Sequence, residues 1–295
     1  MQLNSQFDYQ EFLKNSWQKT PKIFRNFLSY EQLITPDELA GLACESFAES
    51  RLVQKNPPKN VEHGPFLEEL FEELPSEDWT LLVQSVDLYD EQTRNIKRLF
   101  DFIPGWRLDD IMVSFATPGG GVGPHFDHYD VFLIQGEGKR LWQLGETCDH
   151  NTPINKSSQL NLLSDFSVKE EFILEKGDAL YIPPNISHNG ISLTDSLCFS
   201  VGFRAPSVYE MSPQFYGNKK ESNNPFHRFK NSDSADKQKY CWEITESDLK
   251  EAFKISSHED YEGFVRLFGT LVTEPRNKEL FYNDYPIDSL ADLWS

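Results

Sequence analysis

The fold of this chain is decided by the stretch Pro118-Gly119-Gly120-Gly121-Val122-Gly123-Pro124-His125-Phe126-Asp127 and by a later one, Gly177-Asp178-Ala179-Leu180-Tyr181-Ile182-Pro183-Pro184-Asn185-Ile186-Ser187-His188. Residues i and i+2 of a β-strand point to the same side, so His125 and Asp127 can bind one ion without distortion. Two imidazoles and one carboxylate on one face of a divalent metal form the facial triad of non-haem Fe(II) oxygenases. The third ligand, His188, comes from a distant strand, so we expect the site to form only when a barrel closes.

The surroundings of this His-x-Asp motif make it more specific than the motif alone. Glycines at residues 119–123 allow a bend in which backbone segments approach closely. Pro183 and Pro184 form a rigid turn, so we expect a strand to deliver His188 just past it. The alternative is a set of buried polar residues without a metal. The remaining histidines lack a paired ligand at strand spacing, and His128 should point to the opposite face; they are His63, His128, His150, His227 and His258.

Arg140 is a candidate anchor for a cosubstrate. It follows the turn at residues 136–138, and a buried arginine is costly unless it meets a carboxylate. The guanidinium matches a carboxylate in a bidentate manner, and the hydroxyl of Ser114 can bind the same group. We therefore expect 2-oxoglutarate to bind the metal at one end and Arg140 at the other. The alternative is that Arg140 is a surface cation, for which Lys139 is the plainer candidate.

Length and composition bound the class of protein. A chain of 295 residues allows one main domain with an appendage, and its 23 phenylalanines suit a β-rich core. The four cysteines are far apart and form no CxxC pair, which argues against a zinc cluster or a disulfide framework. We read no signal peptide at the N-terminus and no run of 18 apolar residues. We expect a cytoplasmic protein without membrane contact.

The charge balance of the chain indicates which kind of partner it can bind. The formal net charge is −19, which repels nucleic acid phosphates and attracts basic proteins. Residues 61–80 carry seven acidic side chains and no lysine or arginine. This segment is either a solvated acidic face or a steering surface for a basic partner, and charge alone leaves both open. We expect no direct contact with nucleic acid.

Residues 106–206 have the pattern of a β-sandwich or small barrel, because short runs of β-branched and aromatic residues alternate with turn signals. Ahead of them, Thr35 and Glu38 predict a capping box that opens a helix. Residues 81–86 predict a buried strand, and residues 91–102 predict a helix. The strands expected in the barrel are residues 111–116, 131–135, 140–144, 171–174, 179–182 and 197–203.

After Pro206 the chain becomes polar, and residues 219–239 predict a linker or mobile loop. Thr245 and Asp248 predict a second capping box. An apolar stripe then follows at helical spacing, and such stripes pack on the parent domain or on a second subunit. Its members are Tyr261, Phe264, Val265, Phe268 and Leu271.

Over roughly residues 10–210 the chain resembles the JmjC-type ribosomal oxygenases, in particular the bacterial ribosomal protein arginine hydroxylases. The resemblance implies an α+β fold: a double-stranded β-helix of the cupin/JmjC type, flanked by N-terminal helices and a C-terminal helical appendage. It implies His125, Asp127 and His188 as iron ligands, and Ser114 and Arg140 as 2-oxoglutarate-binding residues. Beside the two opening stretches it rests on residues 17–21, 63–66, 104–110, 129–132 and 200–206.

The resemblance also implies a reaction and partners. The reaction is Fe(II)- and 2-oxoglutarate-dependent hydroxylation with O2, at Cβ of an arginine on large-subunit ribosomal protein sixteen. Family members dimerise through helices after the barrel and end in a winged-helix domain. We therefore expect an oxygenase domain at residues 1–206, a linker and helical dimerisation-type region at 207–265, the start of an incomplete winged-helix-like segment at 266–295, and a homodimer.

Three different functions stay open at this point. A related oxygenase would hydroxylate a histidine of a ribosomal protein. A non-catalytic cupin would bind a basic ribosomal partner through its acidic face. A zinc hydrolase or lyase would use the same ligands with an activated water and no O2. If an arginine is the substrate, Tyr129 and Asp130 are candidate partners for it, and a structural role for both is equally open.

Overall fold

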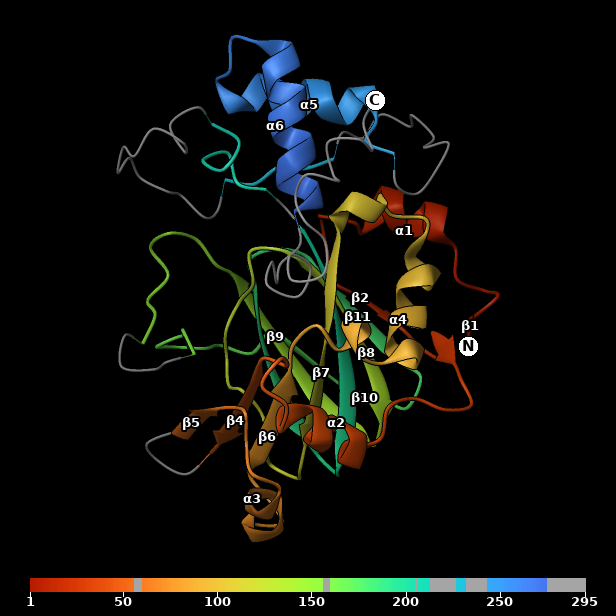
Figure 1. The fold of residues 1–295 in the computed structure, drawn as a ribbon, viewed down its shortest axis with the longest axis vertical. Coiled ribbons are helices and arrows are strands. Elements are labelled where there is room, and N and C mark those ends of the chain that lie inside the picture. Colours follow the sequence, from red (N-terminus) through yellow and green to blue (C-terminus); the bar gives the residue numbers. More distant parts are fainter. Residues whose placement is uncertain (56–59, 156–159, 205, 213–226, 232–242, 275–295) are drawn as a thin grey trace.

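The computed structural model describes residues 1–55, 60–155, 160–204, 206–212, 227–231 and 243–274, and two antiparallel sheets packed face to face form its centre (Figure 1). The larger sheet has the strand order β2-β11-β8-β13-β7-β6-β4-β5, and the smaller has the order β10-β9-β12. This is the double-stranded β-helix that the resemblance implies. Within the described residues, every helix is too short or too polar to span a bilayer.

The elements have the following bounds. The strands are β1 Gln2–Leu3, β2 Lys22–Phe24, β3 Leu28–Ser29, β4 Ser50–Gln54, β5 Asn60–His63, β6 Trp79–Val83, β7 Leu108–Ala116, β8 Asp130–Glu137, β9 Lys139–Thr147, β10 Glu170–Glu175, β11 Ala179–Ile182, β12 Ile186–Ser192 and β13 Ser196–Phe203. The α-helices are α1 Tyr9–Asn15, α2 Pro36–Ala43, α3 Glu68–Glu73, α4 Glu91–Lys97, α5 Glu246–Ser256 and α6 Tyr261–Thr273. Three 3₁₀ turns are η1 Val86–Leu88, η2 Arg98–Phe100 and η3 Gly105–Arg107.

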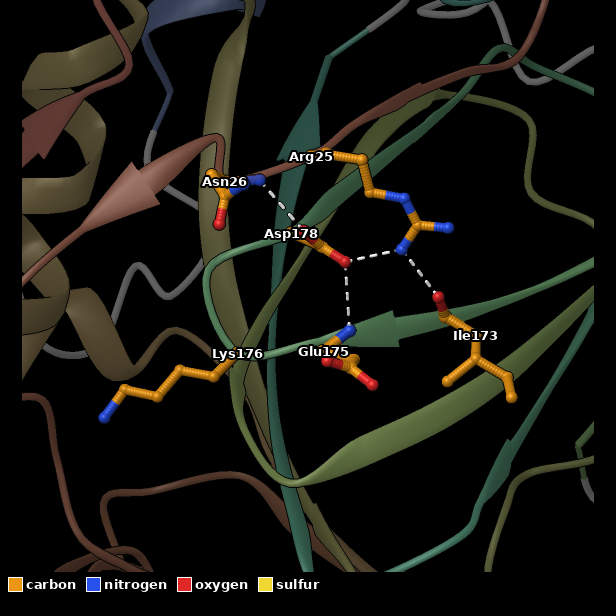
Figure 2. A pocket seen from close by; sticks show the side chains of 6 residues that line it. All are labelled: Arg25, Asn26, Ile173, Glu175, Lys176 and Asp178. Carbon is orange, nitrogen blue, oxygen red and sulfur yellow. Dashed lines mark hydrogen bonds and ion pairs between the residues drawn. The ribbon is translucent and has the colours of Figure 1, made fainter.

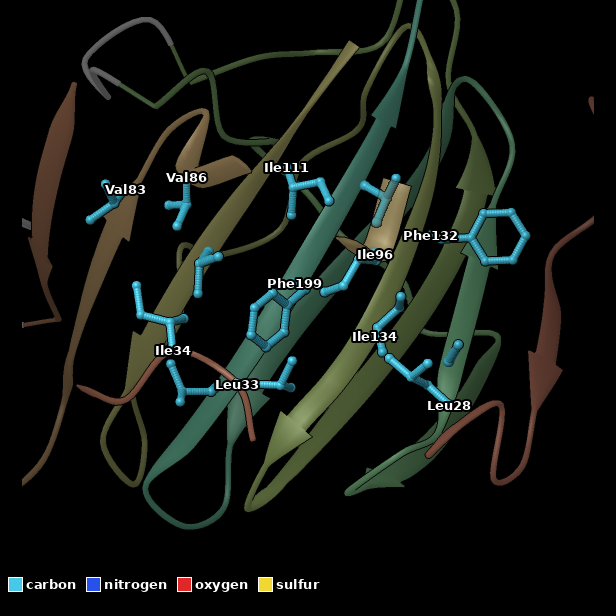
Figure 3. Packing of buried hydrophobic residues seen from close by; sticks show 14 of the residues in the cluster. Leu28, Leu33, Ile34, Val83, Val86, Ile96, Ile111, Phe132, Ile134 and Phe199 are labelled. Atoms are coloured by element: carbon cyan, nitrogen blue, oxygen red, sulfur yellow. The ribbon is translucent and has the colours of Figure 1, made fainter. Parts of the chain in front are cut away.

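The larger sheet contributes to two hydrophobic cores. Alternate residues of a strand face opposite sides, so Phe132 and Phe199 pack outward with Ile96 of α4, as Figure 3 shows. Val131 and Leu133 face inward and pack against Trp142 and Leu144 of the smaller sheet, together with Leu174, Leu180, Ile182 and Cys198. A strand that is buried on both faces is apolar at nearly every position, which explains the continuous run of apolar residues in β8.

All six strands predicted for the barrel are confirmed, each within three residues at its ends. The strand β12, which carries His188, is absent from the prediction because most of its residues are polar and it contains Gly190. The predicted strand 81–86 is wrong at its end, since β6 stops at Val83 and a 3₁₀ turn follows. The predicted helix 91–102 is also wrong beyond Lys97, where a 3₁₀ turn tightens the chain ahead of Pro104.

The helix caps follow the predictions in part. Thr35 caps α2 through the full capping box with Glu38. Thr245 caps α5 by accepting from the Asp248 N–H at 3.1 Å. The second capping box is wrong, because the aspartate carboxylate accepts instead from the Thr245 hydroxyl, at 2.9 Å. An aspartate is one methylene shorter than the glutamate that this motif uses.

The C-terminal helices pack on the parent domain through the predicted stripe. Phe264 and Phe268 are buried against Trp106 of η3, together with Met211, Phe229, Ala252 and Val272. The helix α6 runs across residue 265, where we placed a domain boundary, and the division into three regions stays a prediction. Of the predicted linker 219–239 only residues 227–231 are described, and residues 275–295 of the predicted winged-helix-like segment lie outside the described residues.

A buried ion pair joins five parts of the chain. Arg107 Nη2 lies 3.1 Å from Asp130 Oδ2, and neither side chain is exposed to solvent. Asp130 also accepts from the hydroxyl of Tyr181 and, at 3.5 Å, from Gln18. Arg107 reaches the carbonyl of Phe229 at 3.5 Å. The pair therefore ties together the N-terminal segment, η3, β8, β11 and the segment before α5.

Replacing Asp130 should unfold this junction. Asp130→Ala leaves the Arg107 guanidinium buried without its counter-charge, so the free energy of unfolding should fall by about 3–5 kcal/mol. Urea unfolding followed by circular dichroism measures this. The control Lys169→Met removes an exposed pair with Glu146 and should change stability little. A loss for Asp130→Ala no larger than the control's would contradict the structural role of the pair.

Candidate metal centre

The structure brings the three predicted metal ligands together. Each of His125, Asp127 and His188 offers a ligand atom, and these atoms lie within 4.8 Å of one another. Asp127 Oδ2 is 3.7 Å from His188 Nε2, and the two imidazole centroids are 4.3 Å apart. Within the described residues this is the one group of three such side chains with metal-ligand spacing.

Backbone hydrogen bonds hold the His-x-Asp segment against β12. The N–H of His125 donates to the carbonyl of His188 at 3.0 Å, and the N–H of His188 donates back to the carbonyl of His125 at 2.8 Å. Asn185 N–H donates to the carbonyl of Asp127 at 2.7 Å. The expectation that the motif lies on a regular strand is wrong: His125 forms an isolated bridge, because the ladder between it and β12 is interrupted after one pair.

The glycine-rich loop ahead of the motif continues along β12. Gly119 N–H donates to the carbonyl of Ser192 at 2.8 Å, and Ser192 N–H donates to the carbonyl of Gly120 at 2.9 Å. A Cβ on Gly121 would lie 2.2 Å from the carbonyl oxygen of Gly190. The loop thus approaches β12 more closely than a side chain allows.

The two imidazoles present the nitrogen that a metal needs. Nδ1 of His125 is 2.8 Å from the carbonyl of Gly123, and Nδ1 of His188 is 2.9 Å from the carbonyl of Ile186. A carbonyl at Nδ1 fixes the tautomer in which Nε2 carries the lone pair. Burial, and secondarily His125, lower the pKa of His188 to about 4, so its ring is neutral near pH 7. The donor set therefore fits a divalent cation of the Fe(II) type.

His128 is directed elsewhere, as predicted. Its Nδ1 lies 2.9 Å from Oδ1 of Asn185, and burial lowers the pKa of its ring. A contact of this kind supports the turn that precedes β12 rather than the metal centre.

Arg140 is buried inside the barrel, so the surface-cation alternative is wrong. Its Nη1 donates to Ser114 Oγ at 3.0 Å and its Nη2 to Ser196 Oγ at 2.9 Å, while its Nε has no partner among the described residues. Burial lowers the pKa of Arg140, and no carboxylate of the described residues is paired with it. A buried guanidinium held only by hydroxyls is a site for a carboxylate ligand.

Two serines of this pocket are missing from the sequence prediction. Ser192 lies directly opposite Arg140 in the β9–β12 ladder, and its Oγ is 2.5 Å from that of Ser196. In the sequence, residues 192–196 have the composition of a turn. The pairing of β9 with the unpredicted strand β12 brings Ser192 to the arginine, whereas Ser196 reaches it from the start of β13, one residue ahead of the predicted strand.

The structure distinguishes between Tyr129 and Asp130, the two candidate partners of a substrate arginine. The prediction for Asp130 is wrong, because this side chain is fully buried and already paired with Arg107. Tyr129 is 38% exposed and lies beside Gly202 of β13, so it stays a candidate.

A separate surface pocket of about 420 Å³ contains none of the predicted site residues (Figure 2). Its Arg25 already donates to Asp178 at 2.6 Å and to the carbonyl of Ile173 at 2.7 Å. Glu175 pairs with Lys139 and Lys176 lies over the ring of Tyr30, so this pocket offers no donor set comparable to that around Arg140 among the described residues. The lining residues are Arg25, Asn26, Ile173, Glu175, Lys176 and Asp178.

A double-stranded β-helix with two histidines and one aspartate beside a buried arginine has the fold and site of the JmjC class of the cupin superfamily. Comparison with known proteins agrees, since the family described as JmjC domain matches residues 95–211. The chain is 43% identical over 217 residues to the ribosomal protein uL16 3-hydroxylase of Escherichia coli. The matched region covers 73% of this chain and 57% of that protein.

Two further relatives narrow the class. The chain is 38% identical to a probable ribosomal oxygenase of Haemophilus influenzae over 67% of its own length and 50% of that protein. The structure of YcfD, a ribosomal oxygenase from E. coli in complex with cobalt and 2-oxoglutarate, matches with a TM-score of 0.70 and 32% identity, covering 97% of this chain and 77% of that one. The chain belongs to the JmjC-domain ribosomal oxygenases. It spans about half the length of the curated relatives it matches.

Adding a side chain at Gly121 should move His125 away from His188. In Gly121→Ala the new Cβ meets the backbone of Gly190, so the loop must lift from β12 and carry His125 away from His188. Affinity for Co(II), measured by titration calorimetry, should fall about tenfold or more. Gly41→Ala is the matched control, because nothing lies within 4 Å of a Cβ at that helical position. Equal affinity in the two variants would show that the close approach is dispensable.

Proposed function

We propose that this chain is a 2-oxoglutarate- and Fe(II)-dependent protein hydroxylase that acts at Cβ of an arginine of large-subunit ribosomal protein sixteen. The observation that carries the proposal is the meeting of His125, Asp127 and His188 beside Arg140, a buried guanidinium that has no carboxylate partner among the residues that the structure describes. The relative named uL16 3-hydroxylase supports the choice of ribosomal protein, and the neighbour that holds cobalt and 2-oxoglutarate supports the cofactors.

Each residue has a separate task in this proposal. His125, Asp127 and His188 hold Fe(II), and Arg140 with Ser114 and Ser196 binds the far carboxylate of 2-oxoglutarate. When bound, the metal and 2-oxoglutarate supply the oxidising power from O2 that puts one oxygen atom on a C–H carbon, with succinate and CO2 as co-products. The inward apolar side chains of the barrel exclude water and hold the ligands in one geometry.

The charge of the chain supports a basic protein substrate. The helix α3 carries four exposed glutamates, and the net charge is −19. Such a field accelerates encounters with a positively charged protein and disfavours nucleic acid. Ribosomal proteins are made in the cytoplasm, where we propose that the chain acts. A homodimer is part of the same proposal.

Arg140 should control the affinity for the cosubstrate. Arg140→Lys keeps the charge but loses the planar fork, so the dissociation constant of 2-oxoglutarate from the Mn(II)-loaded chain should rise about tenfold or more. Titration calorimetry measures it. Lys139→Met is the matched control, because this neighbouring cation is exposed and pairs only with Glu175 among the described acidic residues. A control that weakens binding as much as Arg140→Lys does would refute the assignment.

The activity itself is tested by mass spectrometry. With Fe(II), 2-oxoglutarate and O2, the chain should add one oxygen atom to a peptide of ribosomal protein sixteen that contains the target arginine. His125→Ala should abolish the gain, because the metal loses a ligand. A peptide with histidine in place of the arginine distinguishes a histidyl hydroxylase from an arginyl hydroxylase.

A zinc enzyme and a non-catalytic cupin predict different outcomes in the same assay. A zinc hydrolase or lyase would consume no O2 and turn over no 2-oxoglutarate. A non-catalytic cupin would bind the ribosomal protein without modifying it. Metal-loaded chain that leaves both peptides and 2-oxoglutarate unchanged would overturn the proposed function.

A further inference from the structure

The inner face of the smaller sheet carries a polar group that the proposed function does not use. Trp142 of β9 is 5% exposed, and its indole N–H has no hydrogen-bond partner among the described residues. A buried N–H without an acceptor costs free energy, and native proteins tolerate few of them outside functional sites.

The position of this indole is central to the site. In the β9–β12 ladder, Arg140 pairs with Ser192, Trp142 with Gly190 and Leu144 with His188. Successive rungs on one face are about 7 Å apart, as two residues of an antiparallel strand span that distance. Trp142 therefore occupies the rung between the arginine and the histidine.

Side-chain distances agree with the ladder. The indole lies 6.0 Å from Cζ of Arg140 and 6.1 Å, between ring centroids, from His188. A ligand that extends from the metal ligands to the guanidinium must pass beside this ring.

Gly190 makes room for the ring. A Cβ at this position would lie 2.8 Å from two atoms of the six-membered ring of Trp142. The benzo part of the indole thus rests on bare backbone, and the N–H on the five-membered ring remains available. Packing alone explains the ring but leaves the N–H without a role.

We propose that the indole N–H of Trp142 is a third donor to the dicarboxylic cosubstrate, beside the guanidinium of Arg140 and the hydroxyls around it. The proposal rests on the proposed function, because it assumes that 2-oxoglutarate bridges the metal and Arg140. Trp142 then binds the cosubstrate by a charge-assisted hydrogen bond and closes one wall of its pocket.

The variant Trp142→Phe tests this, since it keeps an aromatic ring and removes the N–H. The dissociation constant of 2-oxoglutarate from the Mn(II)-loaded chain should rise about tenfold, the effect expected for one hydrogen bond to a charged group. The affinity for Mn(II) alone should stay at the wild-type value. Titration calorimetry measures both constants.

Trp106→Phe is the matched control. Trp106 is also buried, and its indole N–H lacks a partner in the part of the chain that the structure describes, but it packs in the cluster of α5 and α6. This variant should bind 2-oxoglutarate like the wild type. Equal weakening in both variants would indicate a general loss of structure and overturn the proposal.

A measurement on the unaltered chain covers the case in which Trp142→Phe does not fold. In ¹⁵N-labelled protein, Mn(II) should broaden one indole N–H signal strongly, because Trp142 lies next to His188. In the Zn(II)-loaded chain, 2-oxoglutarate should shift that same signal downfield. An unchanged signal despite bound 2-oxoglutarate overturns the role of Trp142 and leaves the proposed function intact. A wild-type chain that binds no 2-oxoglutarate overturns the proposed function instead.

Discussion

The reciprocal backbone hydrogen bonds between His125 and His188 are the constraint on which the site depends. These residues are 63 positions apart in sequence, and two N–H groups and two carbonyls hold them as one antiparallel pair. The glycine loop extends the contact to Ser192, and Gly121 lets the two backbones approach. Since each imidazole is also oriented through its Nδ1, the protein itself fixes the positions of the two imidazoles.

Polar groups in the interior of the barrel lower the stability of the fold but can bind a ligand. The walls of the barrel are apolar, yet Arg140 and Trp142 keep buried polar hydrogens that have no acceptor within the described ranges. The buried pair of Arg107 and Asp130 is different, because its charges satisfy each other and join the segments around the barrel. Buried donors without acceptors are typical of a ligand-binding site, whereas a buried ion pair is typical of a structural junction.

The sequence predicts the barrel and the three candidate metal ligands because both depend on local patterns: period-2 runs, turn residues and a His-x-Asp motif. It misses β12, whose polar residues become a strand only by pairing with β9. For the same reason Ser192 could not be placed beside Arg140, while Ser196 approaches the arginine from β13 of the larger sheet. Asp130 looked like a substrate contact from its place in the sequence, and only the tertiary position of Arg107 shows that its charge is already used.

Anomalous X-ray diffraction from crystals of the Co(II)-loaded chain tests the central claim most directly. The account predicts one strong peak at bonding distance, about 2.0–2.2 Å, from Nε2 of His125, Nε2 of His188 and a carboxylate oxygen of Asp127. A peak that lacks His188 as a ligand, or cobalt bound only elsewhere on the chain, would contradict it.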